Sequence, residues 1–254
     1  MTRPDPTRIV VERVSGRTRI TELTASRFLR PRLLGGDRDR PRIALIANCA
    51  SLLADDDLRL DVTVGAGARL ELIEPSGTVA YNARGGLARW TADVRVGEGG
   101  TFLWGAAPFV VSSGAQVHRR TGIDLAAGAV ALLRETLVLG RSGERGGAVR
   151  NLLRADLDGS PLYVEDLLLD DHALRTSPTV LGRARVLGTI ALLGTQPEEL
   201  AHPHETLLHG PGAIRRELHE HAHLDEAALA ATWERWRAQV AAPAPAPAAQ
   251  AIAG

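Results

Sequence analysis

The strongest constraint on this chain is a twelve-residue pattern that it repeats three times. Residues 61–72, 93–104 and 122–133 read DVTVGAGARLEL, DVRVGEGGTFLW and GIDLAAGAVALL. Aligned on Gly67, Gly99 and Gly128, the copies share an apolar strand, a turn of small residues and a second apolar strand, at offsets of 32 and 29 residues. A supersecondary unit repeated at nearly constant spacing predicts copies that bury their faces on one another.

The repeat predicts a mainly β protein, built as a stacked or sandwiched antiparallel β scaffold. We interpret the small-residue turns GAGA, GEGG and AAGA as hairpin turns. A phosphate-binding loop would need a following helix and the Lys-Ser/Thr pair of a P-loop, and neither is present in the pattern. A scaffold of this kind suggests binding before it suggests catalysis.

Further strands are expected on both sides of the repeats. Residues 8–24 alternate as a hairpin with its turn at Ser15-Gly16, and residues 149–169 as a second hairpin with its turn at Asp158-Gly159. Residues 30–42 are rich in Pro, Gly and charge and predict a loop. The apolar runs at 43–53 and 187–194 predict buried strands, the latter being the last strand of the fold.

After residue 194 the pattern changes to that of helices. Gly210-Pro211-Gly212 is expected to open a helix that runs to about His221, and Asp225 is expected to cap a second helix over 226–240. In the second helix one stripe at helical spacing is apolar, formed by Leu229, Trp233, Trp236 and Val240. We therefore expect one β-rich domain over 1–240, with a helical part at about 211–240, and a disordered Pro/Ala tail over 241–254.

Composition narrows the function classes. The formal net charge is zero, which argues against nucleic acid or an anionic membrane as the partner. The single cysteine, Cys49, excludes an internal disulfide framework, and we expect it to be buried as a small hydrophobe in a reducing compartment. No run is apolar enough for a membrane span and the N-terminal residues form no apolar leader segment, so a cytoplasmic location is expected.

Histidine is the first candidate for chemistry, because six of the eight histidines lie between residues 202 and 223. His202, His204 and His209 have spacings that occur in metal sites. The sequence places no carboxylate that would complete a known ligand set. A metal site and a group of solvated histidines both remain open here.

Carboxylates inside apolar segments are the second candidate. Glu135 lies within the strand-like run LLRETLVLG, with Arg134 and Arg141 as potential partners, and Glu165-Asp166 follow another apolar stretch. Such side chains either form structural ion pairs or line a polar path through the β core that could pass a cation. No nucleophile motif such as G-x-S-x-G accompanies them.

An ordered series of short motifs resembles the urease accessory protein family UreD, also called UreH, in its actinobacterial form. The series comprises GAGARL, T-x-x-Y at 78–81, P-F at 108–109, GA followed by Arg, RETLVLGR, GE, LGTIALLG and the late WERWR. It extends over roughly residues 40–240. The stretch EPSGTVAY departs from the family pattern, since it lacks the lysine that many members carry there.

The resemblance implies a non-enzymatic scaffold, largely β with a short helical C-terminal part. Such proteins act with the partners UreF and UreG on apo-urease, and nickel is transient cargo with no tightly bound cofactor. Glu135, Glu165 and Asp166 become candidate residues of a metal path. Trp233 and Trp236 become candidate contacts for UreF, with packing in the core as the alternative. A metal-dependent enzyme that uses the 202–223 histidines and a β module with an unknown ligand are the competing hypotheses.

Overall fold

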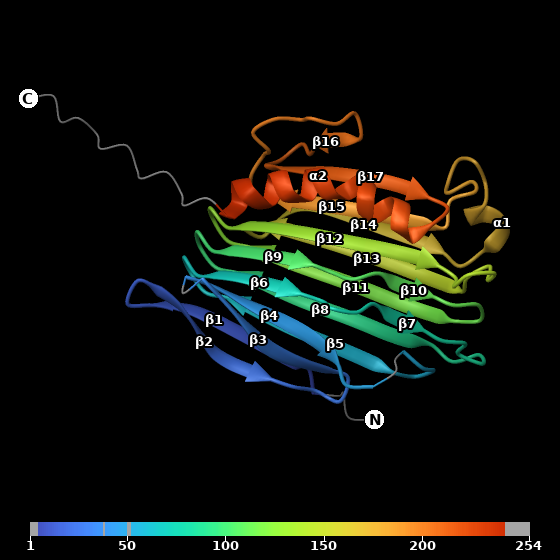
Figure 1. The fold of residues 1–254 in the computed structure, drawn as a ribbon, viewed down its shortest axis with the longest axis horizontal. Coiled ribbons are helices and arrows are strands. Elements are labelled where there is room, and N and C mark those ends of the chain that lie inside the picture. Colours follow the sequence, from blue (N-terminus) through green and yellow to red (C-terminus); the bar gives the residue numbers. More distant parts are fainter. Residues whose placement is uncertain (1–4, 38, 50–51, 242–254) are drawn as a thin grey trace, which may run out of the picture.

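Two β-sheets face each other in the computed structural model, which describes residues 5–37, 39–49 and 52–241 (Figure 1). The first sheet, sheet A, has seven strands in the order β14-β13-β11-β8-β5-β1-β2. Its strands are β1 (Thr7–Val14), β2 (Arg17–Thr24), β5 (Asp57–Val64), β8 (Ala88–Val96), β11 (Gln116–Leu125), β13 (Ala148–Leu157) and β14 (Ser160–Leu169).

The second sheet, sheet B, has ten strands, eight of them in the order β16-β17-β15-β12-β9-β6-β4-β3. These are β3 (Leu29–Asp37), β4 (Arg40–Ala47), β6 (Arg69–Ile73), β9 (Thr101–Gly105), β12 (Val130–Leu139), β15 (Val186–Leu193), β16 (Glu205–Leu207) and β17 (Gly212–His219). The short strands β7 (Thr78–Ala80) and β10 (Phe109–Val111) pair with each other, and β10 also pairs with β12. The helices are α1 (His172–Arg175) and α2 (Ala222–Ala241).

The three sequence repeats are successive rungs of this stack. The first strand of each copy lies in sheet A (β5, β8, β11) and the second in sheet B (β6, β9, β12). Asp61 pairs with Asp93, and Asp93 with Gly122, so the register follows the alignment of the repeats. The β-rich stacked scaffold is confirmed.

The direction of pairing differs from the prediction. Neighbouring rungs pair parallel in both sheets, and antiparallel pairs occur at the outer strands, such as β1 with β2 and β13 with β14. The small-residue turns therefore carry the chain from one sheet to the other and are not hairpins. Gly67, Gly99 and Gly128 adopt φ of 62°, 60° and 66°, a left-handed conformation that glycine adopts without steric cost.

The main apolar core fills the space between the sheets, because alternate residues of each rung point inward. Helix α2 covers the outer face of sheet B and contacts β12, β15 and β17 (Figure 1). Its predicted apolar stripe is confirmed: Leu229, Trp233, Trp236 and Val240 are buried against Leu132 and other residues of sheet B. The helix thus completes a second, smaller core.

The predicted helix that begins at Gly212 is wrong, because this segment is strand β17. It pairs antiparallel with β15 over its whole length. In the run GAIRRELH, Ala213 packs beneath α2 while Ile214 packs between the sheets, which is the alternation of a strand buried on both faces. The remaining helix begins at Ala222, so Asp225 lies in its first turn and is not its cap.

The other expectations have mixed outcomes. Both hairpins are present, with left-handed backbone at Ser15-Gly16 and Asp158-Gly159. The segment predicted as a loop over 30–42 instead forms most of β3 and the start of β4, and Cys49 is exposed rather than buried. Strand β15 is buried throughout, as expected, but β16 and β17 follow it. Of the disordered tail predicted over 241–254, Ala241 is the last residue of α2, and the rest lies outside the described residues.

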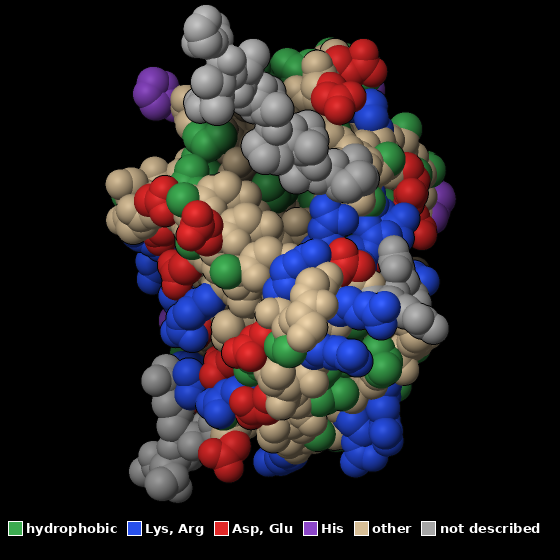
Figure 2. Space-filling view, turned by 90° about the vertical axis from the view of Figure 1, so that its left-hand side faces the viewer, with side chains coloured by type: hydrophobic (Ala, Val, Ile, Leu, Met, Phe, Trp, Pro, Cys, Tyr) green, Lys and Arg blue, Asp and Glu red, His purple; other side chains and the backbone are tan. Residues whose placement is uncertain are grey.

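Within the described residues, no helix combines the length and the apolar character that crossing a membrane requires. Figure 2 looks onto the end of the molecule at which α2 ends, and it shows arginine and carboxylate side chains spread over that surface. This surface chemistry agrees with the balanced charge of the sequence.

Candidate functional site

A polar cluster lies between the two sheets, and Glu135 is at its centre. Odd-numbered residues of β12 point inward, so Glu135 lies among apolar side chains and is 8% exposed. Its Oε1 accepts hydrogen bonds from Arg119 Nη2 at 2.6 Å and from Thr121 Oγ1 at 3.3 Å, both on β11. The expected partner, Arg134 or Arg141, is not the one observed. Arg134 is on the opposite face of β12, and Arg141 pairs with Glu144.

Arg119 is held between aromatic rings. Its guanidinium carbon lies 4.8 Å from the ring centre of Trp90 and 5.4 Å from that of Phe109, and Nη1 donates to Asn151 Oδ1 at 2.9 Å. Burial acts to lower the pKa of Arg119, but the adjacent Glu135 carboxylate outweighs it, so the net shift is upward. The cation is thus stabilised by aromatic faces and by a carboxylate.

A third member of the cluster, Glu74, is not among the residues that the sequence pattern points to. It follows β6 in the segment EPSG and is half-buried, and its Oε1 accepts a hydrogen bond from Trp104 Nε1 at 3.0 Å. Burial raises the pKa of Glu74 to about 7, although Arg119 and the Trp104 hydrogen bond act in the opposite direction. Near neutral pH this carboxyl is therefore partly protonated. No local motif marks it, because its partner is 30 residues away.

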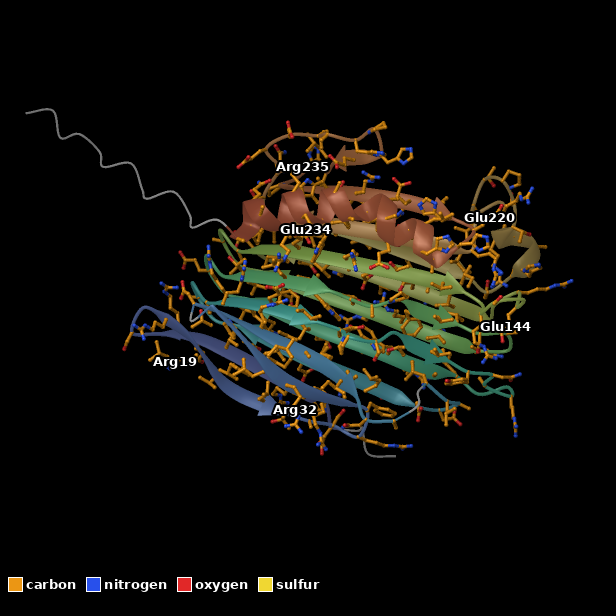
Figure 3. The ribbon with its side chains drawn as sticks, in the orientation of Figure 1. Arg19, Arg32, Glu144, Glu220, Glu234 and Arg235 are labelled. Atoms are coloured by element: carbon orange, nitrogen blue, oxygen red, sulfur yellow. The ribbon has the colours of Figure 1, made fainter. Side chains whose placement is uncertain are left out.

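Glu74 also lines a cavity of about 600 Å³ between α2 and sheet B. Carboxylates outnumber arginines in its lining, which consists of Glu71, Glu74, Asp225, Glu226, Glu234, Arg42, Arg134, Arg237 and His223 together with small and apolar residues. Figure 3 shows Glu234 on the side of α2 away from β16, whereas Arg235 points toward β16. Because the exposed Glu226 and Glu234 line the same cavity as Glu74, the cavity connects the surface of the protein with the interior cluster at Glu74.

Asp225 lies at the wall of this cavity and is 1% exposed. Its Oδ2 accepts a hydrogen bond from Thr136 Oγ1 at 2.8 Å, while Oδ1 has no hydrogen-bond partner. Burial raises the pKa of Asp225, and the Thr136 hydrogen bond offsets only part of that effect. The carboxylate packs on the backbone of Gly188, where a Cβ atom would lie 1.8 Å from Oδ1. Glycine at this position is therefore what lets the helix approach the sheet.

The structure does not bring the three predicted path residues together. Glu165 on β14 points inward and accepts a hydrogen bond from Arg216 Nη2 at 2.8 Å. Asp166 is exposed on the opposite face of β14, where Arg150 Nε donates to it at 2.9 Å. Adjacent residues of a strand point to opposite faces, so Glu165 and Asp166 cannot line the same interior path.

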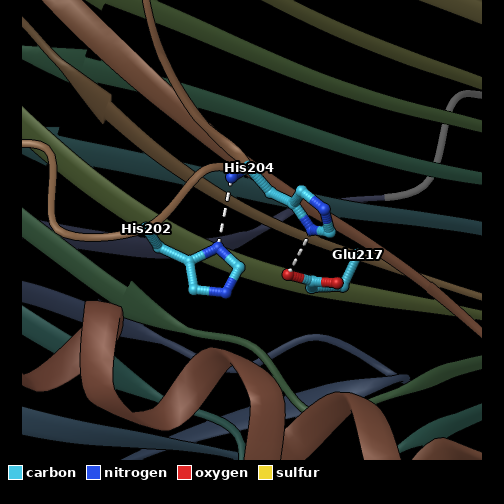
Figure 4. Close-up of side chains that lie close together, drawn as sticks. All are labelled: His202, His204 and Glu217. Carbon is cyan, nitrogen blue, oxygen red and sulfur yellow. Dashed lines mark hydrogen bonds and ion pairs between the residues drawn. The ribbon is translucent and has the colours of Figure 1, made fainter.

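Two of the three candidate histidines do lie together, with a carboxylate that the sequence did not reveal. His202, His204 and Glu217 each offer a ligand atom, and these atoms all lie within 4.8 Å of one another (Figure 4). Glu217 is on β17, the segment for which the sequence predicts a helix. His209 is exposed and is not part of this group.

The two candidate tryptophans are packing residues. Trp236 is fully buried and Trp233 is 9% exposed, both in the core beneath α2. Trp233 also contacts the cavity, where the Arg134 guanidinium lies 5.7 Å from its ring centre. Trp236 presents no surface to a partner protein.

Comparison with known proteins identifies the family to which this architecture belongs. The sequence profile described as "UreD urease accessory protein" matches residues 6–251. The chain belongs to this family. It is 52% identical to urease accessory protein UreD 1 of Streptomyces griseus over 236 residues, which cover 92% of each chain. It is also 39% identical to UreD of a Parafrankia species over 70% of this chain and 68% of the relative, and 34% identical to UreD of Cereibacter sphaeroides over 80% and 76%.

The family assignment confirms the resemblance found in the motif series and decides between the hypotheses about chemistry. These relatives are named as accessory proteins of urease, so the chain is a maturation factor rather than an enzyme. The hypothesis of a metal-dependent enzyme built on the 202–223 histidines is therefore not supported.

Proposed function

We propose that this UreD-family chain is a scaffold for the insertion of nickel into apo-urease, in a complex with UreF- and UreG-like proteins in the cytoplasm. The observation that carries the proposal is the match to a curated urease accessory protein over 92% of both chains. The family name gives the accessory role toward urease. Nickel delivery and the identity of the partners are our inference.

The interior carboxylates support a role for the chain in passing the metal. Glu74 lines the cavity beneath α2 and is coupled electrostatically to Glu135 and Arg119 between the sheets. Carboxylate oxygens can bind a divalent cation once they are deprotonated. Because the pKa of Glu74 is about 7, the carboxyl is partly protonated at neutral pH, so a cation that arrives from the cavity releases a proton when it binds.

Glu135 is the next carboxylate inward from Glu74, but it is held by Arg119 at 2.6 Å. A cation that binds Glu135 Oε1 replaces Arg119 there, and Asn151 and the two aromatic rings remain to hold the arginine. We propose Glu74 and Glu135 as path residues. Glu165 lies at the far end of the sandwich in its pair with Arg216, and Asp166 faces solvent.

Exposed apolar residues at sheet edges support docking to protein partners. On the edge strand β14, Val164 and Leu168 are 52% and 56% exposed, and on the edge strand β3, Leu33 and Leu34 are 55% and 54% exposed. Unpaired strand edges that carry apolar side chains favour association with another chain. These edges replace Trp233 and Trp236 as our candidate contact surfaces.

The test is co-expression of this chain with the urease subunits and the UreF- and UreG-like proteins of the same organism. We expect a stable complex by size-exclusion chromatography with light scattering, and urease that loses its nickel and its activity when this chain is omitted. A chain that forms no complex with any of them, or urease that is fully loaded without it, would refute the proposal.

The path residues are tested in the same system with Glu74→Gln and Glu135→Gln. Both should lower the nickel content of urease while the complex still assembles. Asp166→Asn is the matched control, since this carboxylate faces solvent, and it should leave nickel content unchanged. Equal loading of urease with all three variants would refute the path and leave the scaffold role standing.

A further inference from the structure

We infer that His202, His204 and Glu217 form an exchangeable binding site for a late first-row divalent metal ion, on the outer face of this chain beside α2. The site is distinct from the interior carboxylates, and it does not depend on the proposed nickel delivery to urease. Its ligand set of two imidazoles and one carboxylate is one that proteins use for borderline metal ions such as Zn²⁺ and Ni²⁺.

The loop that carries the histidines is restrained in a way that brings the two rings together. Glu205 N donates to His202 O at 3.0 Å, which closes a turn with Pro203 at its second position. Proline fixes φ at that position and favours such a turn. The two imidazole centres are 5.0 Å apart, and the backbone N–H of His204 donates to His202 Nδ1 at 3.1 Å.

The carboxylate comes from a rigid element. Glu217 is on β17, which pairs with β15 along its length, and the side chain is 8% exposed. His204 Nδ1 lies 2.9 Å from Glu217 Oε1. With ligands at 2.0–2.2 Å from an ion, this separation matches the roughly 2.8–3.1 Å between adjacent octahedral ligands, and it is shorter than the roughly 3.3–3.6 Å of a tetrahedral site. His204 and Glu217 are therefore already placed as a ligand pair, and His202 is the ligand that has to approach.

A cationic side chain already occupies the place of the ion. Arg215 Nη2 lies 2.6 Å from Glu217 Oε1 and 3.3 Å from His202 Nε2, so it contacts two of the three ligands. A neutral imidazole accepts a hydrogen bond at only one nitrogen, yet both nitrogens of His202 face donors. Coordination of an ion through Nε2 places the ring proton on Nδ1, so His202 gives up the hydrogen bond from the His204 N–H when it binds an ion.

Arg215 has other acceptors to which it can remain bound when an ion arrives. Its guanidinium also donates to Thr232 Oγ1 at 3.0 Å and to Ala228 O at 3.2 Å, and it lies 3.9 Å from Glu205 Oε1. Competition with Arg215 weakens binding, and the exposed side chain of His204 gives the ion access to solvent. Both features fit a site that exchanges its metal and does not serve as a structural anchor.

The test measures binding of Ni²⁺ to the full-length chain, purified with an affinity tag that contains no histidine. Equilibrium dialysis against Ni²⁺, with Mg²⁺ as the hard-ion control, should show Ni²⁺ bound in preference to Mg²⁺. We expect His204→Ala and Glu217→Gln each to weaken Ni²⁺ binding roughly tenfold or more. His209→Ala is the matched control, since it removes an exposed histidine of the same segment and should leave binding unchanged.

X-ray absorption at the nickel edge gives a second readout that does not depend on affinity. Two imidazole ligands are expected in the wild-type protein and one in His204→Ala. Circular dichroism verifies that each variant is folded, and His204→Ala, which truncates an exposed side chain, keeps the test decisive if Glu217→Gln does not fold. Binding unchanged in His204→Ala, an equal loss in His209→Ala, or nickel bound without imidazole would overturn the inference.

Discussion

The raised pKa of Glu74 predicts that the stability of this protein falls as pH rises from about 4.5 to about 7. A carboxyl whose folded pKa lies above its unfolded value binds more protons in the folded state, so deprotonation favours unfolding. The pKa of Glu74 is raised from 4.5 to about 7, chiefly by burial. The loss of stability should therefore develop between about pH 4.5 and pH 7 and be complete above that range.

The magnitude follows from the size of the shift. At about 1.4 kcal/mol per pKa unit, the full shift corresponds to about 3 kcal/mol in the free energy of unfolding at pH 8. Because the side chain is only partly buried, solvent screening reduces this value, and we expect about 1–3 kcal/mol. Glu74→Gln keeps an oxygen acceptor for Trp104 and removes the ionisation. It should stabilise the protein by this amount at pH 8 and by little at pH 5.

Urea unfolding at pH 5 and pH 8 measures the effect. With a slope of about 1–3 kcal/mol per molar, the midpoint at pH 8 should rise by about 1 M in Glu74→Gln. Glu98→Gln, at an exposed turn, is the control and should follow the wild type at both pH values. If wild type and Glu74→Gln keep a constant difference from pH 5 to pH 8, the raised pKa of Glu74 is refuted.

Three further predictions concern packing and the interior ion pair. Gly188→Ala should destabilise the protein by about 1–3 kcal/mol because the new methyl group meets Asp225, and adding Asp225→Ala should recover part of the urea midpoint. Trp236→Ala should cost about 3–5 kcal/mol, since the ring is fully buried beneath α2; a midpoint within error of wild type would contradict that packing. Arg119→Met should cost about 3–5 kcal/mol by leaving Glu135 buried and unpaired, whereas Arg119→Met combined with Glu135→Leu should be close to wild type in the same assay.

Local sequence was sufficient where a conformation depends on neighbouring residues. The turns at Gly67, Gly99 and Gly128 were found from spacing alone, because left-handed backbone favours glycine. The apolar stripe of α2 was visible for a similar reason, since helical periodicity follows directly from burial of one face.

Strand β17 shows where local pattern misled. Gly-Pro-Gly before a charged, histidine-rich segment is typical of a helix start, yet pairing with β15 along the whole segment overrides that preference. The error had a consequence for the site, because Glu217 could be recognised as a neighbour of His204 only once β17 was known to be a strand.

The sequence by itself determined that this chain is a stack of β-rung repeats with a terminal amphipathic helix, and its ordered motifs determined the family. These features could be predicted because repeat spacing, turn glycines and periodic apolar residues are visible in the amino-acid sequence itself. Only the tertiary structure decided that the rungs pair parallel. A strand–turn–strand unit has the same sequence pattern whether its two strands pair with each other as a hairpin or enter two different sheets.

The composition of each site was likewise decided in three dimensions. Glu135 pairs with Arg119 of the opposite sheet, and Glu74 pairs with Trp104 of a neighbouring rung. Glu217 contacts His204, which lies in the turn before the adjacent strand β16. The partners in these pairs are 16, 30 and 13 residues apart in the chain. Charge and hydrogen bonding act through space, so only the packing of the two sheets and α2 could show which ionisable groups share an environment.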